Sequence, residues 1–225
     1  MFILDLLFPK FCLGCGYIGV YLCPSCLKKL EPVKLDVCLY CKKPSLIGLT
    51  HVNCGNKLNI DGMIAIYHYN PMLKIIIKNI KYRLAVQVWN DFYKMISPEV
   101  ISKLDCYKNL PSDLVIQPIP LSKNKFNERG FNQASFIGTF FQRFLHFPIV
   151  NLLSRNKEVP AQAQIKNKVG RYQNIKGIFT ATQGVNQNIL LIDDIITSGS
   201  TVKEAARILK SAGAKKIYVL ALAKG

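Results

Sequence analysis

Two adjacent carboxylates and a group of hydroxyls lie close together in residues 189–201, and their types suggest a shared ligand. Asp193 and Asp194 are followed by a hydroxyl-rich loop, which contains Thr197, Ser198, Gly199, Ser200 and Thr201. The N–H groups and hydroxyls of such a loop can bind a phosphate where a helix begins, because the helix dipole favours an anion there. Carboxylates beside a phosphate are tolerated when they accept hydrogen bonds from sugar hydroxyls or act through a divalent cation. The stretch therefore predicts a sugar-phosphate site.

A buried strand and a helix must position these side chains. Residues 189–192 form a continuous apolar run, which is typical of a strand covered on both faces in a parallel sheet. Residues 202–214 have the apolar spacing of a helix. Ligands of such sheets bind at the carboxyl ends of the strands, where the acid pair stands. The stretch lacks the lysine of a Walker loop and the GxGxxG of a dinucleotide fold, so neither of those nucleotide sites is indicated.

Residues 189–201 resemble the phosphoribosyl pyrophosphate (PRPP) motif of type I phosphoribosyltransferases. The resemblance implies that residues 197–201 hold the 5-phosphate. It also implies that Asp193 and Asp194 are the catalytic acids, which meet the ribose hydroxyls, with Mg²⁺ bound to PRPP. The alternative is a buried strand whose Asp-Asp turn only caps a helix.

A second strand is predicted at residues 114–119, and it runs into Pro120, Leu121 and Ser122. In type I phosphoribosyltransferases the corresponding loop holds the pyrophosphate, so the resemblance assigns that role to these three residues. Arg129 follows in the segment RGFNQ, and its planar guanidinium suits phosphate oxygens. Asn132 is expected to cap a helix with an apolar face.

A basic segment without acidic residues extends from residue 159 to residue 192. Three interpretations stay open for its cations: closure over PRPP in a flexible loop, contact with a DNA backbone, or a solvated surface. Lys78 and Lys81 recur at helical spacing and are weaker candidates for nucleic-acid contact. The predicted nucleic-acid residues are Lys78, Lys81, Lys166, Lys168 and Arg171, and Arg171 is also assigned to the pyrophosphate loop.

Seven of the eight cysteines fall between residues 12 and 54, mostly as CxxC pairs, which is a pattern typical of zinc ribbons. The predicted ligands are Cys12, Cys15, Cys23 and Cys26 for one ion, and Cys38, Cys41, His51 and Cys54 for another. An alternative has one ion shared by Cys12, Cys15, Cys38 and Cys41. A module this short has too little core to fold without its metal.

The cysteine pairs, RGFNQ and the acid pair together resemble the ComF family of competence proteins. The resemblance implies an α/β fold, with a type I phosphoribosyltransferase-like parallel sheet flanked by helices at residues 58–225 and a small Cys-rich zinc ribbon at residues 1–57. It also implies a role in DNA uptake during natural transformation. The expected partners are PRPP, single-stranded DNA, a competence helicase and other DNA-uptake proteins. The alternative function is a phosphoribosyltransferase of nucleotide salvage or synthesis with an unidentified acceptor.

The charge balance agrees with a polyanionic partner. Thirty Lys and Arg against thirteen Asp and Glu give a net charge of +17, which suits nucleic acid or an acidic membrane surface. No apolar run reaches the roughly 18 residues that a membrane span needs, and the N-terminus does not read as a signal peptide. We therefore predict a cytoplasmic protein, for which peripheral membrane contact stays open.

Overall fold

The structure is a computed structural model, and it describes residues 9–54, 59–80, 88, 90–91, 98–108, 111, 113–156 and 175–225. The elements follow in the order α2 (Pro24–Leu27), 3-10 turns η1 (Leu46–Gly48) and η2 (Val52–Cys54), β1 (Gly62–His68), α3 (Pro71–Ile80), α5 (Pro98–Lys108), β2 (Leu114–Pro118), α6 (Lys123–Arg129), α7 (Gln133–Leu145), β3 (Leu153–Arg155), β4 (Phe179–Ala181), β5 (Asn188–Ile196), α9 (Ser200–Ser211) and β6 (Ile217–Lys224).

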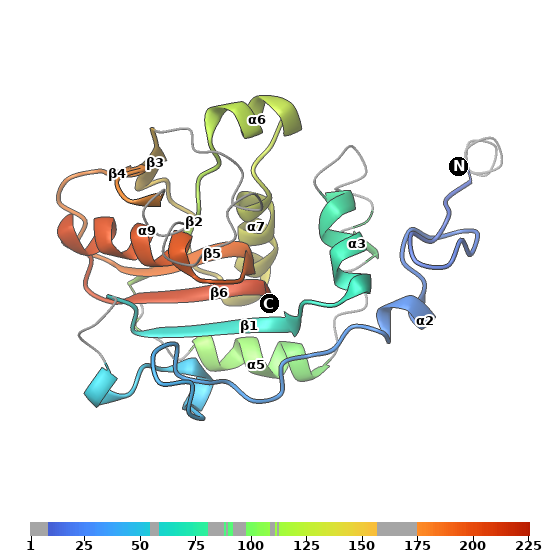
Figure 1. Cartoon of the computed structure of the whole chain (residues 1–225), viewed down its shortest axis with the longest axis horizontal. Helices are drawn as coiled ribbons and strands as arrows, with labels where there is room; N and C mark the ends of the chain where they lie inside the picture. Colours follow the sequence, from blue (N-terminus) through green and yellow to red (C-terminus); the bar gives the residue numbers. More distant parts are fainter. Residues whose placement is uncertain are drawn as a thin grey trace.

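A parallel sheet with the strand order β1-β6-β5-β2 forms the centre of the molecule (Figure 1). The register places Pro118 of β2 beside Ile192 of β5, and Ala221 of β6 beside Asp193. Because parallel strands end at the same edge, the segments that follow β2 and β5 meet there. The predicted α/β fold is confirmed.

Helices cover both faces of the sheet, as the apolar run in β5 requires. Leu190 and Ile192 pack with side chains of α3, α5 and α7 in one buried cluster. Ile189 and Leu191 pack with α9 and with the β3–β4 hairpin in the other cluster. Alternate residues of β5 therefore enter opposite cores, which holds the end of the strand firmly in place.

Irregular segments pair with both outer strands of the sheet. The N–H of Val33 donates to the carbonyl of Ile66 at 2.9 Å, and the N–H of His68 donates to the carbonyl of Glu31 at 2.8 Å, so residues 31–33 cover β1. On the other side, Ile116 of β2 exchanges backbone hydrogen bonds with Pro148 and Val150. Neither outer strand presents a bare row of backbone groups over these residues.

The N-terminal module packs on the sheet through both of these cores. Cys12, Leu22 and Cys26 lie in the same buried cluster as Leu73 of α3. Leu39 lies in the cluster on the other face, with Met63 of β1. The module thus crosses the β1 edge and buries its apolar residues against the large domain, as expected for a segment too short to form its own core.

Several elements differ from the sequence-based expectations. The helix after the acid pair begins at Ser200 rather than at Val202, so Ser200 and Thr201 belong to its first turn. Helix α6 was not expected, because KNKFNER has no apolar face. Between α3 and α5 the described residues Val88, Asn90 and Asp91 are helical. Asn132 caps α7 as predicted, since its side chain accepts from the N–H of Ala134 at 3.0 Å.

Candidate functional site

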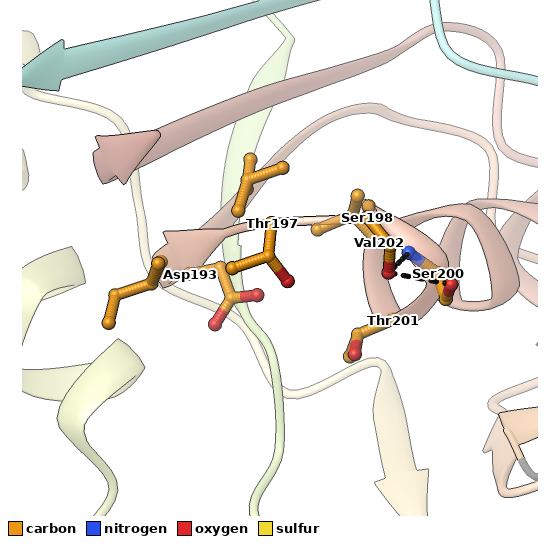
Figure 2. Close-up of a pocket in the computed structure, with 9 residues that line it drawn as sticks. Asp193, Thr197, Ser198, Ser200, Thr201 and Val202 are labelled. Carbon is orange, nitrogen blue, oxygen red and sulfur yellow. Dashed lines mark hydrogen bonds between the residues drawn. The ribbon is translucent and has the colours of Figure 1, made fainter. Parts of the chain in front are cut away.

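A small hollow of about 30 Å³, open to solvent, lies where β5 ends and α9 begins. Figure 2 shows Asp193 and Thr197 on one side of it and the hydroxyls of the first turn of α9 on the other. Residues 197–201 are called the hydroxyl loop below, and all five line the hollow together with Asp193, Ile195, Ile196 and Val202. Asp194 does not belong to this lining. The structure thus brings the loop and one of the two predicted acids to a common space.

The N-terminus of α9 is suited to an anion. Gly199 is its N-cap residue with φ 71° and has no side chain to cap the helix, and the first turn contains no acidic residue. The hydroxyl oxygens of Ser198 and Ser200 lie 2.9 Å apart, and the N–H of Ser200 points to the Ser198 oxygen at 3.4 Å. A helix start without a side-chain cap leaves N–H donors for a ligand. A phosphate at this position would take the place of the missing cap.

Gly199→Ala is expected to weaken phosphate binding because alanine disfavours the backbone conformation of this residue, and not because its methyl group lacks space. A methyl group at Gly199 would meet its nearest neighbour at 3.6 Å, which is ordinary contact, but the positive φ disfavours any L-residue by roughly 1–2 kcal/mol. Gly184, with φ 72° and open space around it, is the matched control. Both alanine variants should lose about 1 kcal/mol of unfolding free energy in urea titrations. Only Gly199→Ala should lower phosphate affinity in calorimetry, and equal affinities would contradict the assignment of the loop.

Backbone N–H groups orient the two carboxylates. The N–H of Asp194 donates to Oδ1 of Asp193 at 2.9 Å, and the N–H of Ile195 donates to Oδ1 of Asp194 at 2.7 Å. Both side chains are half-buried. Fixed carboxylates at the mouth of an anion site can accept hydrogen bonds from sugar hydroxyls, or hold a hard cation such as Mg²⁺.

The segment after β2 meets β5 at the same edge. The N–H of Ile119 donates to the carbonyl of Ile192 at 2.9 Å, and the side chain of Asn132 donates to the carbonyl of Ile119 at 2.9 Å. Pro120 and Leu121 are half-buried, whereas Ser122 is buried at the start of α6. These contacts tie the predicted pyrophosphate loop to both β5 and the start of α7.

Arg129 ends α6, where its Nη1 donates to Oε1 of Gln133 at 2.9 Å. The guanidinium is thereby fixed near the start of α7, but Arg129 does not line the hollow beside Asp193. Lys78 lies on an exposed position of α3. Lys81, Lys166, Lys168 and Arg171 lie outside the described residues, so their predicted roles stay predictions.

Glu204 is a residue that the sequence did not single out. It is fully buried in α9, accepts from the N–H of Gly177 at 2.7 Å and accepts from Arg207 at 2.9 and 2.7 Å. Burial alone would raise the pKa of Glu204, but the hydrogen bonds from Arg207 and Gly177 outweigh it and lower that pKa. The carboxylate therefore ties the segment that leads into β4 to the helix that begins at the hydroxyl loop.

Glu204→Gln is expected to lower the free energy of unfolding by about 2 kcal/mol at neutral pH, because a charge-assisted network is lost from a buried position. Since folding lowers the pKa of Glu204, its contribution is complete above the ordinary value of 4.5 and is lost as the pH falls through the lowered value. The gap between variant and wild type in urea unfolding should therefore shrink on acidification. Glu128→Gln, at an exposed position of α6, is the control. A gap that stays constant with pH would contradict this role.

The first cysteine cluster contains Cys12, Cys15, Cys23 and Cys26, and its sulfurs lie within 4.8 Å of one another. Sγ of Cys15 and Sγ of Cys23 are 3.6 Å apart, close to the roughly 3.8 Å expected between two sulfurs on one tetrahedral zinc. Burial opposes ionisation of Cys12, yet N–H groups of Cys23, Gly14 and Cys15 lower its pKa to about 6. Burial and the neighbouring thiols raise the pKa of Cys26 to about 12. A cation is thus needed to hold all four sulfurs as thiolates.

The second cluster contains Cys38, Cys41, His51 and Cys54. Nε2 of His51 lies 3.1 Å from the carbonyl of Pro44, which can only accept, so Nε2 carries the proton. Nδ1 then presents its lone pair toward Sγ of Cys41 at 3.3 Å. Metal-ligating histidines are oriented in this manner by a second hydrogen bond. The donor set fits zinc, and the fold does not gather the alternative set of Cys12, Cys15, Cys38 and Cys41.

His51→Ala is expected to reduce the zinc content from two ions per chain, one for each cluster, to about one. The reason is that the second cluster would keep only three of its four ligands, two of them partly or fully exposed. Zinc can be counted with a chromogenic chelator after denaturation. His68→Ala, which removes an exposed histidine from the end of β1, should keep the full zinc content. Unchanged zinc content in His51→Ala would remove His51 from the ligand set.

Known protein domains match both the N-terminal and the C-terminal part of the chain. A double zinc ribbon domain matches residues 3–57, and a phosphoribosyl transferase domain matches residues 147–225. Competence protein ComFC of Bacillus subtilis (strain 168) is 31% identical over 200 residues, which cover 85% of this chain and 78% of that protein. This chain belongs to the ComF family.

Further ComF-like relatives extend over most of the chain. Competence protein F of Haemophilus influenzae is 28% identical and covers 90% of each chain, and DNA utilization protein YhgH of Escherichia coli (strain K12) is 25% identical, covering 94% of this chain and 93% of that one. All the predicted metal ligands fall within residues 3–57, the range that matches the double zinc ribbon domain, and the acid pair and the hydroxyl loop fall within residues 147–225, the range that matches the transferase domain.

The solved structures that this chain resembles are more distant. The allosteric regulatory enzyme of purine biosynthesis is 20% identical with a TM-score of 0.35, over 54% of this chain and 24% of that one. Adenine phosphoribosyltransferase from Leishmania tarentolae is 13% identical with a TM-score of 0.33, over 57% of this chain and 72% of that one. Both likenesses are too weak to bear on ligands.

No helix in the described part of the chain has the length and apolarity to cross a bilayer.

Proposed function

We propose that this ComF protein acts in DNA uptake, binds Mg²⁺ and PRPP at the end of β5, and contacts single-stranded DNA. The observation that carries the PRPP part is the hollow in which Asp193 faces the N-terminus of α9, which has no side-chain cap. The hydroxyl loop would bind the 5-phosphate through N–H groups and hydroxyls. Asp193 and Asp194 would orient the ribose through its hydroxyls. The segment of Pro120, Leu121 and Ser122 would meet the pyrophosphate, with Arg129 close to it.

Magnesium would supply neutralisation of the pyrophosphate charge. Carboxylate oxygens and ligand phosphates are the partners that Mg²⁺ prefers, and Asp193 and Asp194 offer such oxygens beside the hollow. What the chain itself contributes is a fixed orientation, because each acid is held by the N–H of the following residue.

The proposed contact with DNA rests on the net charge of the chain and on its similarity to known proteins. The chain has a net charge of +17, and its relatives are competence and DNA utilization proteins. Lys78, Lys81, Lys166, Lys168 and Arg171 are the candidate phosphate contacts.

Calorimetric titration with PRPP, with and without Mg²⁺, tests the ligand site, and saturable magnesium-dependent binding is expected. Anisotropy with labelled oligo-dT at several salt concentrations tests the DNA contact, for which affinity should fall steeply with salt. Absence of heat with PRPP would refute the first part. A salt-independent DNA affinity would refute phosphate contact.

An active phosphoribosyltransferase is the second candidate, and the match of residues 147–225 to a transferase domain favours it. Catalysis would then rest on orientation and electrostatic stabilisation at the ribose, with no covalent intermediate. A screen for pyrophosphate release with bases and amines as acceptors tests this candidate. PRPP binding without release in any of these reactions would favour a ligand-sensing role.

A further inference from the structure

Exposed apolar side chains are concentrated in the N-terminal module. Large exposed hydrophobic residues in residues 9–54 are Phe11, Tyr17, Ile18, Leu35, Leu46 and Val52. The first three of them share one hairpin, residues 10–19, which is called the aromatic hairpin below. Phe11 is 50% exposed, Tyr17 65% and Ile18 63%, so one short hairpin presents two rings and an aliphatic side chain to solvent. Grouped exposure of this kind marks an interaction surface.

The aromatic hairpin is held rigidly. Phe11 and Ile18 are bridge partners, and the N–H of Cys12 donates to the carbonyl of Tyr17 at 2.7 Å. The N–H of Gly19 also donates to the carbonyl of Lys10 at 2.8 Å. Cys12 and Cys15, which belong to the first cysteine cluster, lie inside this hairpin. A backbone that is ordered before binding lowers the conformational entropy that its side chains lose on contact with a partner.

The chain around the hairpin is mostly basic. Residues 6–30 contain no Asp or Glu but contain Lys10, Lys28 and Lys29, and the last two are exposed. One carboxylate, that of Asp91, approaches this segment and accepts from the N–H of Tyr21 at 2.8 Å. Rigid aromatic rings beside cations are the combination that binds unpaired bases, because rings stack on bases while cations meet the backbone phosphates. An apolar pocket of another protein, or a lipid surface, would bind an aliphatic side chain as well as a ring. Replacing the rings by leucine therefore distinguishes such partners from unpaired bases.

We propose that the aromatic hairpin is a stacking surface for the unpaired bases of single-stranded DNA. The inference rests on the DNA contact of the proposed function and gives it a location that none of the predicted lysines provides. In Figure 1 the hairpin is the blue chain beside α2, beyond α3 from the C-terminus, which lies beside Thr197 of the hydroxyl loop. No residue of the hairpin lines the hollow, so loss of stacking there should leave PRPP binding unchanged.

The test compares two double variants in anisotropy titrations with labelled oligo-dT of about 20 nucleotides. Phe11→Ala with Tyr17→Ala should weaken binding about tenfold for each ring, with the salt slope unchanged. Phe11→Leu with Tyr17→Leu keeps apolar area but no ring, and it should lose as much. Phe126→Ala, which removes a ring of similar exposure (48%) from α6, is the matched control. Zinc content and thermal unfolding confirm that each variant is folded.

Distinct results would overturn the inference. If the leucine pair binds DNA like wild type, the contact is apolar and not stacking. If the alanine pair binds DNA normally but no longer sediments with anionic phosphatidylglycerol vesicles, the hairpin meets a membrane. If wild type itself does not bind oligo-dT, the DNA part of the proposed function fails and the hairpin inference fails with it. If the alanine pair binds DNA normally, only the stacking role of the hairpin is refuted.

Discussion

Asp193→Asn is expected to lower the affinity for magnesium-PRPP by on the order of a hundredfold. Asp193 lines the hollow, and a charge-assisted hydrogen bond is worth about 1.5–3 kcal/mol, where 1.4 kcal/mol is about tenfold. Asparagine keeps the shape but removes the charge that would hold Mg²⁺ and the ribose hydroxyls. Calorimetric titration with PRPP at saturating Mg²⁺ gives the measurement. Asp194→Asn, measured in parallel, tells whether the acid outside the lining takes part.

Asp113→Asn is the matched control, since it removes the same charge just before β2, at the opposite edge of the sheet. The hydrogen bonds from Lys215 and Asn188 lower the pKa of Asp113, so this variant should lose some stability at neutral pH, a difference that disappears on acidification, but it should leave PRPP binding intact. Oligo-dT affinity should be unchanged in Asp193→Asn or slightly raised, because one negative charge is lost. Equal loss of PRPP binding in both variants would mean that charge alone, and not the site, sets the affinity. A parallel loss of DNA affinity in Asp193→Asn would mean that the two ligands share a surface.

Cys26→Ser is expected to lower the midpoint of thermal unfolding by about 10 °C or more. Binding of a structural zinc contributes folding free energy, and a loss of about 4 kcal/mol shifts a midpoint by roughly 8–16 °C in a chain of this size. Cys26 is buried in one cluster with Leu22, Leu30 and Met72, so loss of its metal disturbs the core as well as the ribbon. Differential scanning calorimetry together with a zinc count checks both effects.

Cys54→Ser provides the contrast within the same module. Cys54 is half-buried and belongs to the second cluster, whose Cys41 is exposed. Its substitution should release the second zinc with a clearly smaller change in the midpoint. An equal loss of stability in the two variants would contradict the different integration of the two clusters in the core.

The buried strand, the loop before α9 and the grouping of the cysteines could be predicted because each depends on local sequence. An apolar run of four residues before Asp193 has few alternatives to a buried parallel strand, and the two cysteines of a CxxC pair lie close together in most local folds. The resemblance to ComF proteins supplied the rest of the expected layout, and the comparisons confirm that family.

The features that escaped prediction depend on tertiary packing. Glu204 and Arg207 look like a solvated helical pair in sequence, and only the approach of Gly177 makes the glutamate a buried acceptor. Helix α6 has no apolar stripe, and the contacts of the flanking segments hold it in place. Asp193 lines the hollow and Asp194 does not, and this difference depends on the backbone at the end of β5, which residue types alone do not specify.

Coverage of β1 by residues 31–33 links metal supply to solubility. These residues lie between the two cysteine clusters, so bound ions would help to keep the segment in register against Ile66 and His68. If loss of zinc released this segment, the edge of β1 would be uncovered, and an uncovered edge is a template for pairing with a second copy. We therefore expect zinc-starved cells to accumulate this protein as self-associated material rather than as a soluble apo form. The ribbon would then also protect the chain from aggregation.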